Sequence, residues 1–248
     1  MLASDGNTPH CTDLYWQVQG YSIPADYRYW LYSGLVLVCP PLKTDTEWRW
    51  QLGGIDGAAN GSSLILGEAS RLHIRTPSDR VPELVAALAG QVVRIGSSLI
   101  QVGSVSAAPV SYRPNLTAWI VAIRLAGQTR SYLASEFEFG VTFGKQMLKH
   151  GLETKPRLKS RAGFRIKGDL VRGFGVGFQG LKPEESVWLQ CNGLGGSRRI
   201  GAGVFVPAHA STTLDSGTLR TNAQQRRAGF GDLARAGSPR SRLTAPAG

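Results

Sequence analysis

Residues 173–207 read GFGVGFQGLKPEESVWLQCNGLGGSRRIGAGVFVP. In the first six, glycine alternates with Phe174, Val176 and Phe178, which is the period of a β-strand. Pro183 then stands where a helix starts, because proline is favoured at the first helical position. This helix is expected to reach about Asn192. A glycine-rich loop at residues 193–203 leads into a last strand at residues 204–206, so the stretch predicts the order strand, helix, strand.

The same stretch contains the pattern GxGxxG at Gly175, Gly177 and Gly180. A dinucleotide site would also need an acidic residue about twenty positions further on, where this chain has Arg198 and Arg199. Glycines inside a strand instead mark a bulge or a close approach of another backbone. We therefore exclude a dinucleotide-binding reading.

Working outward, the order strand, helix, strand, strand, helix, strand occurs twice, which predicts an α+β fold of two ferredoxin-like domains. The first domain is expected at residues 1–107 and the second, with the glycine-rich loop, at residues 115–207. A basic tail at residues 208–248 is expected to be flexible without RNA. The expected strands are residues 14–23, 47–52, 64–76, 91–102 (one strand, or a hairpin broken at Gly96-Ser97), 116–125, 164–167 and 171–178. The expected helices are residues 26–38 (with Asp26 as N-cap), 78–90 (opened by Ser78), 129–150 and 183–192.

The composition excludes several classes. The chain has 248 residues, of which 42% are hydrophobic, but no apolar run long enough to span a bilayer and no N-terminal signal sequence. Its three cysteines lack the spacing of a zinc site and fit a reducing cytoplasm. None of its four histidines has metal-ligand spacing, and His73 is read as a residue of an edge strand. We expect a cytoplasmic protein with no metal or other cofactor.

The charge is concentrated in the second part of the chain. Residues 141–248 hold 18 of the 28 Lys and Arg but only six of the 17 Asp and Glu. A basic half beside a near-neutral half favours a polyanionic partner such as a nucleic acid.

Two basic segments are candidates for RNA contacts. In the first segment, basic residues spaced by two are expected to lie on one side of an extended chain, where they would follow an RNA backbone. The alternative is an edge strand protected by charge. The glycine-rich loop would bring backbone N–H groups and paired arginines to phosphates, or would be a tight turn with solvated arginines. The first segment contains Lys155, Arg157, Lys159 and Arg161, followed by Arg165, Lys167 and Arg172, and the loop contains Gly195, Gly196, Arg198 and Arg199.

Residues 173–207 resemble the C-terminal signature of a CRISPR-associated RAMP family, the endoribonucleases that cut precursor CRISPR RNA within its repeats. Residues 24–35, PADYRYWLYSGL, are similar to the first helix of that family. The resemblance covers about residues 14–207, and the tandem ferredoxin-like (RRM-like) order is also the fold of that family.

The resemblance implies binding of a CRISPR repeat hairpin and metal-independent cleavage. In the family a ribose 2′-hydroxyl attacks the adjacent phosphate, which leaves a 2′,3′-cyclic phosphate and a free 5′-hydroxyl. Many relatives carry a histidine in the first helix, where this chain has Tyr27 and Arg28, so these two are the candidate catalytic residues. Arginine is a poor base but can neutralise the charge of the phosphorane. The missing histidine and the arginine-rich second half resemble the type IV branch. Within that second half, Arg242 is also expected to contact RNA.

The hypothesis is therefore an endoribonuclease that matures CRISPR RNA, keeps its product and joins other subunits of an effector complex. One alternative is a catalytically inactive subunit that holds CRISPR RNA, which the missing histidine favours. Another is a scaffold whose basic half meets acidic proteins. A steep loss of RNA affinity with salt would exclude the scaffold, because phosphate contacts release counterions.

Overall fold

The computed structural model describes residues 10–123 and 134–208. Arg242 and almost all of the predicted tail lie outside the described residues. The elements are β1 (Cys11–Gln19), β2 (Ser22–Pro24), α1 (Arg28–Val38), α2 (Pro41–Thr44), β3 (Gln51–Ile55), β4 (Ala58–Asn60), β5 (Ser63–Ile65), β6 (Arg71–Pro77), the 3₁₀ turn η1 (Ser78–Arg80), α3 (Val81–Leu88), β7 (Val92–Ile95), β8 (Ser98–Pro109), β9 (Leu116–Val121), α4 (Glu136–Lys149), β10 (Arg157–Ile166), β11 (Asp169–Phe178), α5 (Pro183–Asn192), the 3₁₀ turn η2 (Arg198–Ile200) and β12 (Val206–Pro207).

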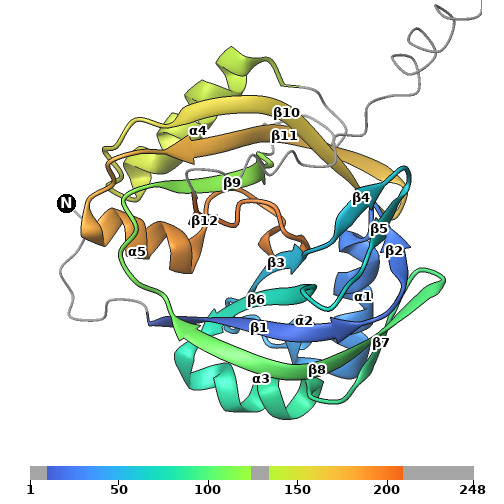
Figure 1. The fold of residues 1–248 in the computed structure, drawn as a ribbon. Coiled ribbons are helices and arrows are strands. Elements are labelled where there is room, and N and C mark those ends of the chain that lie inside the picture. Colours follow the sequence, from blue (N-terminus) through green and yellow to red (C-terminus); the bar gives the residue numbers. More distant parts are fainter. Residues whose placement is uncertain (1–9, 124–133, 209–248) are drawn as a thin grey trace, which may run out of the picture. The chain divides into compact units, whose positions relative to one another are not determined.

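Two sheets carry the ferredoxin-like strand order. The first is β3-β6-β1-β8-β7 and the second is β10-β11-β9-β12, so in each the first long strand lies between the third and the last (Figure 1). A third, small sheet joins β2, β5 and β4. The predicted tandem ferredoxin-like fold is confirmed, whereas the division at residues 107 and 115 stays a prediction. In residues 10–123 and 134–208, no helix is long and apolar enough to cross a membrane.

Each sheet buries one face under its helices. In the first sheet, the alternate residues Leu14 and Trp16 of β1 face the same core as Leu35 of α1 and Leu84 of α3. In the second sheet, the aromatic side chains of β11 pack against Phe139 and Phe143 of α4 and against residues of α5. The glycines of β11 therefore lie on the opposite face, as the alternation predicted. This face packs in part against α1.

Gly173 shows why β11 needs glycine on that face. A Cβ atom there would lie 2.1 Å from the carbonyl oxygen of Val121 on the neighbouring strand β9. The two backbones can approach this closely only without a side chain.

Several predicted boundaries are wrong. The expected strand at residues 64–76 is two strands, β5 and β6, which belong to different sheets. The expected strand at residues 47–52 lies later, as β3. The helix expected at residues 78–90 does open at Ser78, but its first turn is the 3₁₀ turn η1, and α3 follows with Arg80 as N-cap. Asp26 does not cap α1, because its carboxylate accepts the backbone N–H of Arg165 at 3.1 Å and the N-cap is Tyr27.

The helix predicted at residues 129–150 is confirmed as α4, but over a shorter range. Its first predicted residues, 129–133, lie outside the described residues. The helix begins after Ser135, whose hydroxyl accepts the N–H of Glu138 at 3.2 Å while the Glu138 carboxylate accepts the N–H of Ser135 at 2.8 Å. This reciprocal capping box satisfies backbone donors that a helix start leaves free.

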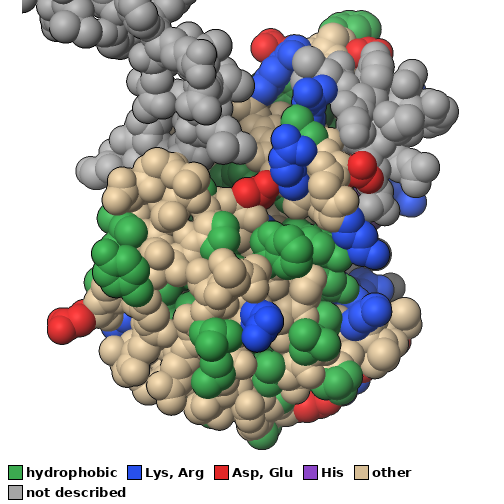
Figure 2. Space-filling model, turned by 90° about the vertical axis from the view of Figure 1, so that its right-hand side faces the viewer, with side chains coloured by type: hydrophobic (Ala, Val, Ile, Leu, Met, Phe, Trp, Pro, Cys, Tyr) green, Lys and Arg blue, Asp and Glu red, His purple; other side chains and the backbone are tan. Residues whose placement is uncertain are grey.

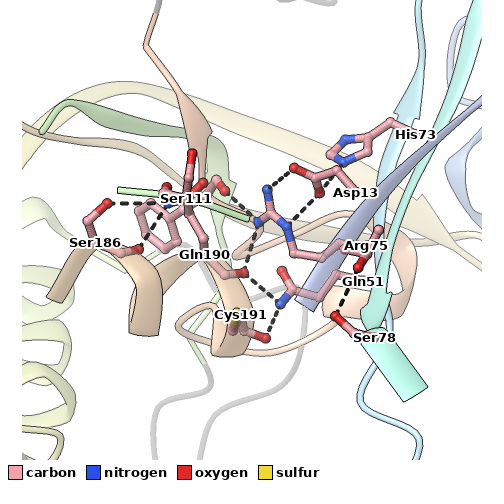
Figure 3. Close-up of polar contacts among 11 residues, drawn as sticks. Asp13, Gln51, His73, Arg75, Ser78, Ser111, Ser186, Gln190 and Cys191 are labelled. Atoms are coloured by element: carbon pink, nitrogen blue, oxygen red, sulfur yellow. Dashed lines mark hydrogen bonds and ion pairs between the residues drawn. The ribbon is translucent and has the colours of Figure 1, made fainter. Parts of the chain in front are cut away.

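The face of the first sheet opposite its helices carries a buried polar network (Figure 3). Arg75 of β6 is fully buried and pairs through two nitrogens with the Asp13 carboxylate, at 2.7 and 3.0 Å. Its third nitrogen donates to the backbone carbonyls of Gln190 on α5 and Phe205 next to β12, both at 2.8 Å. The network therefore joins the first sheet to the second ferredoxin-like unit.

His73 belongs to the same network. It lies on β6, an interior strand, so the expectation of an edge histidine is wrong. Its Nε2 is 2.8 Å from the Asp13 carboxylate and its ring stacks on Tyr15, with 4.7 Å between the ring centroids.

We expect acid to weaken the fold through Asp13. Burial raises the pKa of this carboxyl, but the hydrogen bond with His73 and the charge and hydrogen bonds of Arg75 outweigh burial and hold the pKa well below its ordinary value. A lowered pKa in the folded state contributes stability above the unfolded pKa of about 3.9 and loses it as the pH falls below that value. Urea unfolding between neutral pH and about pH 3 measures this slope. Asp13→Asn should flatten the slope; an unchanged slope would contradict the assignment.

Candidate functional site

The glycine-rich loop at residues 193–203 is folded tightly on itself and on β9. A Cβ atom on Gly203 would lie 1.9 Å from the carbonyl oxygen of Leu194, and Gly203 has a φ of 69°, so only glycine fits. The Gly203 N–H donates to Ile120 of β9 at 2.7 Å, and the Gly196 N–H donates to Ala122 at 2.9 Å. The loop is therefore a rigid platform, and the Gly196 amide is not available to a phosphate.

The paired arginines of the loop do different things. Arg199 donates from Nη2 to the backbone carbonyls of Asp45 and Trp48, at 3.2 and 2.9 Å, and so ties the loop to the segment before β3. Arg198 keeps much of its side-chain surface open to solvent, and among the described residues it donates to the carbonyl of Gly195 in its own loop, at 3.2 Å. Partial burial, and then the charges of Arg49 and Arg199, lower the pKa of Arg198. Arg198 is the loop arginine that is available to an anion.

A pocket of about 860 Å³ lies beside this loop. The lining combines the loop with the end of α4, one side of α5, α1 and the segment that leads into β3. Among the described residues, the lining includes three arginines, one lysine, one histidine and several aromatic rings, and no Asp or Glu. The basic and aromatic lining residues include Arg49, Lys149, His150, Trp188, Arg198 and Arg199.

Sequence reasoning singled out Arg198 and Arg199 but missed Arg49 and His150. Arg49 was hidden in the run Trp48-Arg49-Trp50, which reads as part of a strand, and His150 has no motif around it. The single local signal was the pair Lys149-His150 at the end of a predicted helix.

Arg28 lies at the junction of α1, β3 and the glycine-rich loop. Its guanidinium stacks on Trp119, 4.4 Å from the ring centroid, and donates to the carbonyl of Gly53 at 3.3 Å. A Cβ atom on Gly201 would lie 2.2 Å from Arg28 Nη1, so this glycine leaves room for the guanidinium. Arg28 is not among the residues that line the pocket, as far as the described part of the chain goes.

Tyr27 is buried, and its hydroxyl is fully engaged. The hydroxyl accepts the N–H of Ile55 at 2.8 Å and donates to the Ile55 carbonyl at 3.2 Å. This geometry favours a role in holding α1 against β3.

The first basic segment is split between two faces of the sheet. β10 is an edge strand, but a bulge between Leu158 and Arg161 inserts one residue and reverses the alternation. Lys159 covers the glycine face and bonds Thr117 at 2.7 Å. Arg161 lies on the other face, over the ring of Phe174 at 5.2 Å. The expectation that residues 155–161 present one row of charge is therefore wrong.

The remaining residues of this segment also divide by position. Arg157 pairs with Gly177 and lies on the glycine face with Lys159, whereas Arg172 lies on the same face as Arg161. Arg165 lies at the hairpin end, where Nη1 donates to the carbonyl of Gly168 at 2.9 Å. Lys155 and Lys167 are exposed before the strand and in the turn, respectively. Figure 2 shows Lys and Arg side chains in a column on the side of the molecule where this hairpin ends.

Nowhere in residues 10–123 and 134–208 do three or more His, Cys, Asp or Glu side chains form a group that could hold a metal ion.

Residues 12–210 match the family model described as Cas6 Crispr. The CRISPR-associated endonuclease Cas6 of Myxococcus xanthus strain DK1622 is 26% identical over 211 residues, which are 85% of this chain and 87% of that protein. Among solved structures, a Cas6-related protein of Pyrococcus furiosus has a TM-score of 0.60 at 14% identity and covers 81% of this chain and 99% of that one. A structure described as an RAMP protein binding different RNA substrates has a TM-score of 0.55 at 13% identity, over 80% of this chain and 100% of that one. The two structures support the fold.

Proposed function

Because the chain belongs to the Cas6 family of CRISPR endonucleases, we propose that it binds a CRISPR repeat hairpin and cuts precursor CRISPR RNA by attack of a ribose 2′-hydroxyl. The products are a 2′,3′-cyclic phosphate and a 5′-hydroxyl, and the protein keeps the matured RNA. It works in the cytoplasm with other subunits of an effector complex. The type IV assignment stays a prediction.

The observation that carries this proposal is the basic pocket beside the glycine-rich loop. Arg49, Lys149, Arg198 and Arg199 converge there, with no carboxylate in the lining. Such a site attracts phosphate, and fixed cations in a hollow stabilise the extra negative charge of a phosphorane.

Around the pocket, the exposed cations on β10 and β11 support binding of the hairpin stem. Double-stranded RNA is recognised through its shape and its phosphates. Lys and Arg side chains on both faces of an edge strand therefore suit a stem better than a single straight row of them would. Arg157 and Lys159 serve one face, and Arg161 and Arg172 the other. Gly195 and Gly196 hold the loop against Ala122 at the end of β9, and so fix the position of Arg198 beside the RNA.

In this proposal, the guanidinium of Arg28 stabilises the negative charge of the phosphorane. Among the described residues, only one of its N–H groups has a recorded acceptor, the Gly53 carbonyl, so others are available to a phosphate oxygen. The stack on Trp119 holds the guanidinium in place. Tyr27 acts as a positioning residue, since its hydroxyl is engaged by Ile55.

The function is tested with purified protein, a labelled repeat hairpin and EDTA, together with the same RNA carrying one 2′-deoxy sugar at the cut. We expect cleavage that survives EDTA and stops with the deoxy sugar, because that sugar lacks the nucleophile. RNA affinity should fall steeply with salt. Tight binding without any cut would instead support the inactive RNA-holding subunit, and loss of activity in EDTA would contradict the metal-independent route.

A further inference from the structure

The proposed reaction needs a group that removes the 2′-hydroxyl proton, and Arg28 is unsuited to that step. Guanidinium groups do not give up their proton in proteins and so cannot accept another. The first helix has no histidine. The base must therefore be a titratable side chain that another element brings to the basic pocket.

His150 is the one histidine in the lining of this pocket. It follows the last residue of α4, is partly exposed, and lies against Trp188 of α5 with 4.6 Å between the ring centroids. Within the described residues, neither ring nitrogen has a recorded hydrogen-bond partner. The ring is therefore held on one side by Trp188, while its nitrogens are available to a ligand.

Among the described residues, the charges that act on His150 are those of Lys149, which precedes it, and of Arg198 in the glycine-rich loop. Arg49 and Arg199 line the same pocket. On the side of α5, the Glu185 carboxylate is engaged elsewhere, since it accepts the backbone N–H groups of residues 153 and 154 at 2.6 and 3.1 Å. Burial, and then Lys149 and Arg198, lower the pKa of His150. These causes favour the neutral imidazole, which can accept a proton.

The size and lining of the pocket suit one unstacked nucleotide. Its volume of about 860 Å³ lies within the range of roughly 300–1,000 Å³ that small-molecule sites occupy. Unpaired bases of RNA are bound by stacking on aromatic side chains, and Tyr32 and Trp188 both line the hollow. Arg198 is available to the phosphate, whereas Arg199 holds the loop in place.

We propose that this pocket binds the nucleotide on the 5′ side of the cut and that His150 is the general base for its 2′-hydroxyl. This rests on the proposed function. In the step, a neutral ring nitrogen of His150 takes the proton of the 2′-hydroxyl, and the oxygen forms a bond to the adjacent phosphorus. The bond from phosphorus to the 5′-oxygen of the next nucleotide breaks, and that oxygen takes a proton from water. Arg198 binds the phosphate in the pocket and, together with Arg28, neutralises the phosphorane. The imidazolium then releases its proton to solvent.

The test measures single-turnover cleavage in EDTA from about pH 5 to 9, a range that spans the ordinary titration of histidine. The wild type should speed up with rising pH and then level off as His150 becomes neutral. His150→Gln and His150→Gly should cut about 10²–10⁴-fold more slowly and lose the rising limb. Added imidazole should restore His150→Gly in proportion to its neutral form. RNA affinity and thermal stability should stay at wild-type values, and His10→Ala, a change of an exposed histidine outside the pocket, should have no effect.

Two results would overturn the role of His150 while leaving the proposed function intact. One is wild-type cleavage by both variants. The other is slow cleavage that keeps the wild-type pH profile and does not respond to imidazole, which would indicate a binding or structural role. Absence of cleavage by the wild type itself would overturn the proposed function and this inference together.

Discussion

Arg28→Ala is expected to slow single-turnover cleavage of a repeat hairpin about 10²–10³-fold, the usual cost of removing one preorganised donor to a transition-state oxygen. The guanidinium is held by Trp119 and by the carbonyl of Gly53, and the missing side chain of Gly201 gives it room beside the glycine-rich loop. RNA affinity should change little, because the stem meets other cations. The measurement is the cleavage rate at saturating protein beside a binding titration.

Two matched variants sharpen this result. Arg28→Lys keeps the charge but loses the planar stack and the several fixed N–H groups, so it should restore little of the rate. Arg94→Ala removes an exposed arginine from β7, at the edge of the first sheet farthest from β3, and should leave cleavage unchanged. Wild-type cleavage by Arg28→Ala would show that this residue only braces α1 against the loop. A loss that follows the melting temperature would lead to the same conclusion.

Arg75→Met is expected to lower the free energy of unfolding by about 3–5 kcal/mol, because it leaves a buried carboxylate without its ion-pair partner. Arg75 is fully buried, and Asp13 is nearly so. The change also removes the donor to the carbonyls of Gln190 and Phe205, which joins the first sheet to α5 and to the segment before β12. Urea unfolding, followed by tryptophan fluorescence, measures the effect.

The double variant Asp13→Asn with Arg75→Met is the informative comparison. It removes the uncompensated charge as well as its partner, so it should recover a substantial part of the loss. Arg80→Ala breaks a partly exposed ion pair with Asp45 and should shift the midpoint far less. Equal shifts for Arg75→Met and Arg80→Ala would contradict the account of a buried pair.

The sequence determined the elements that depend on local periodicity and on local caps. Glycine alternating with Phe174 and Phe178 predicted a strand, and the structure has β11 there. Pro183 predicted the start of α5. Two repeats of one element order led to the tandem ferredoxin-like fold. These features depend on neighbouring residues, so a single sequence contains them.

Only the tertiary structure decided which charged side chains meet. Arg49, His150 and Arg198 are distant in the chain and reach one pocket because three separate elements pack together. The bulge in β10 that turns Arg161 to the other face has no sequence signature, and one inserted residue reverses every side chain beyond it. Arg198 and Arg199 are adjacent in sequence yet differ in role, since the fold brings backbone carbonyls to Arg199 and leaves Arg198 in the pocket. Such long-range packing depends on all the elements at once, and no local pattern encodes it.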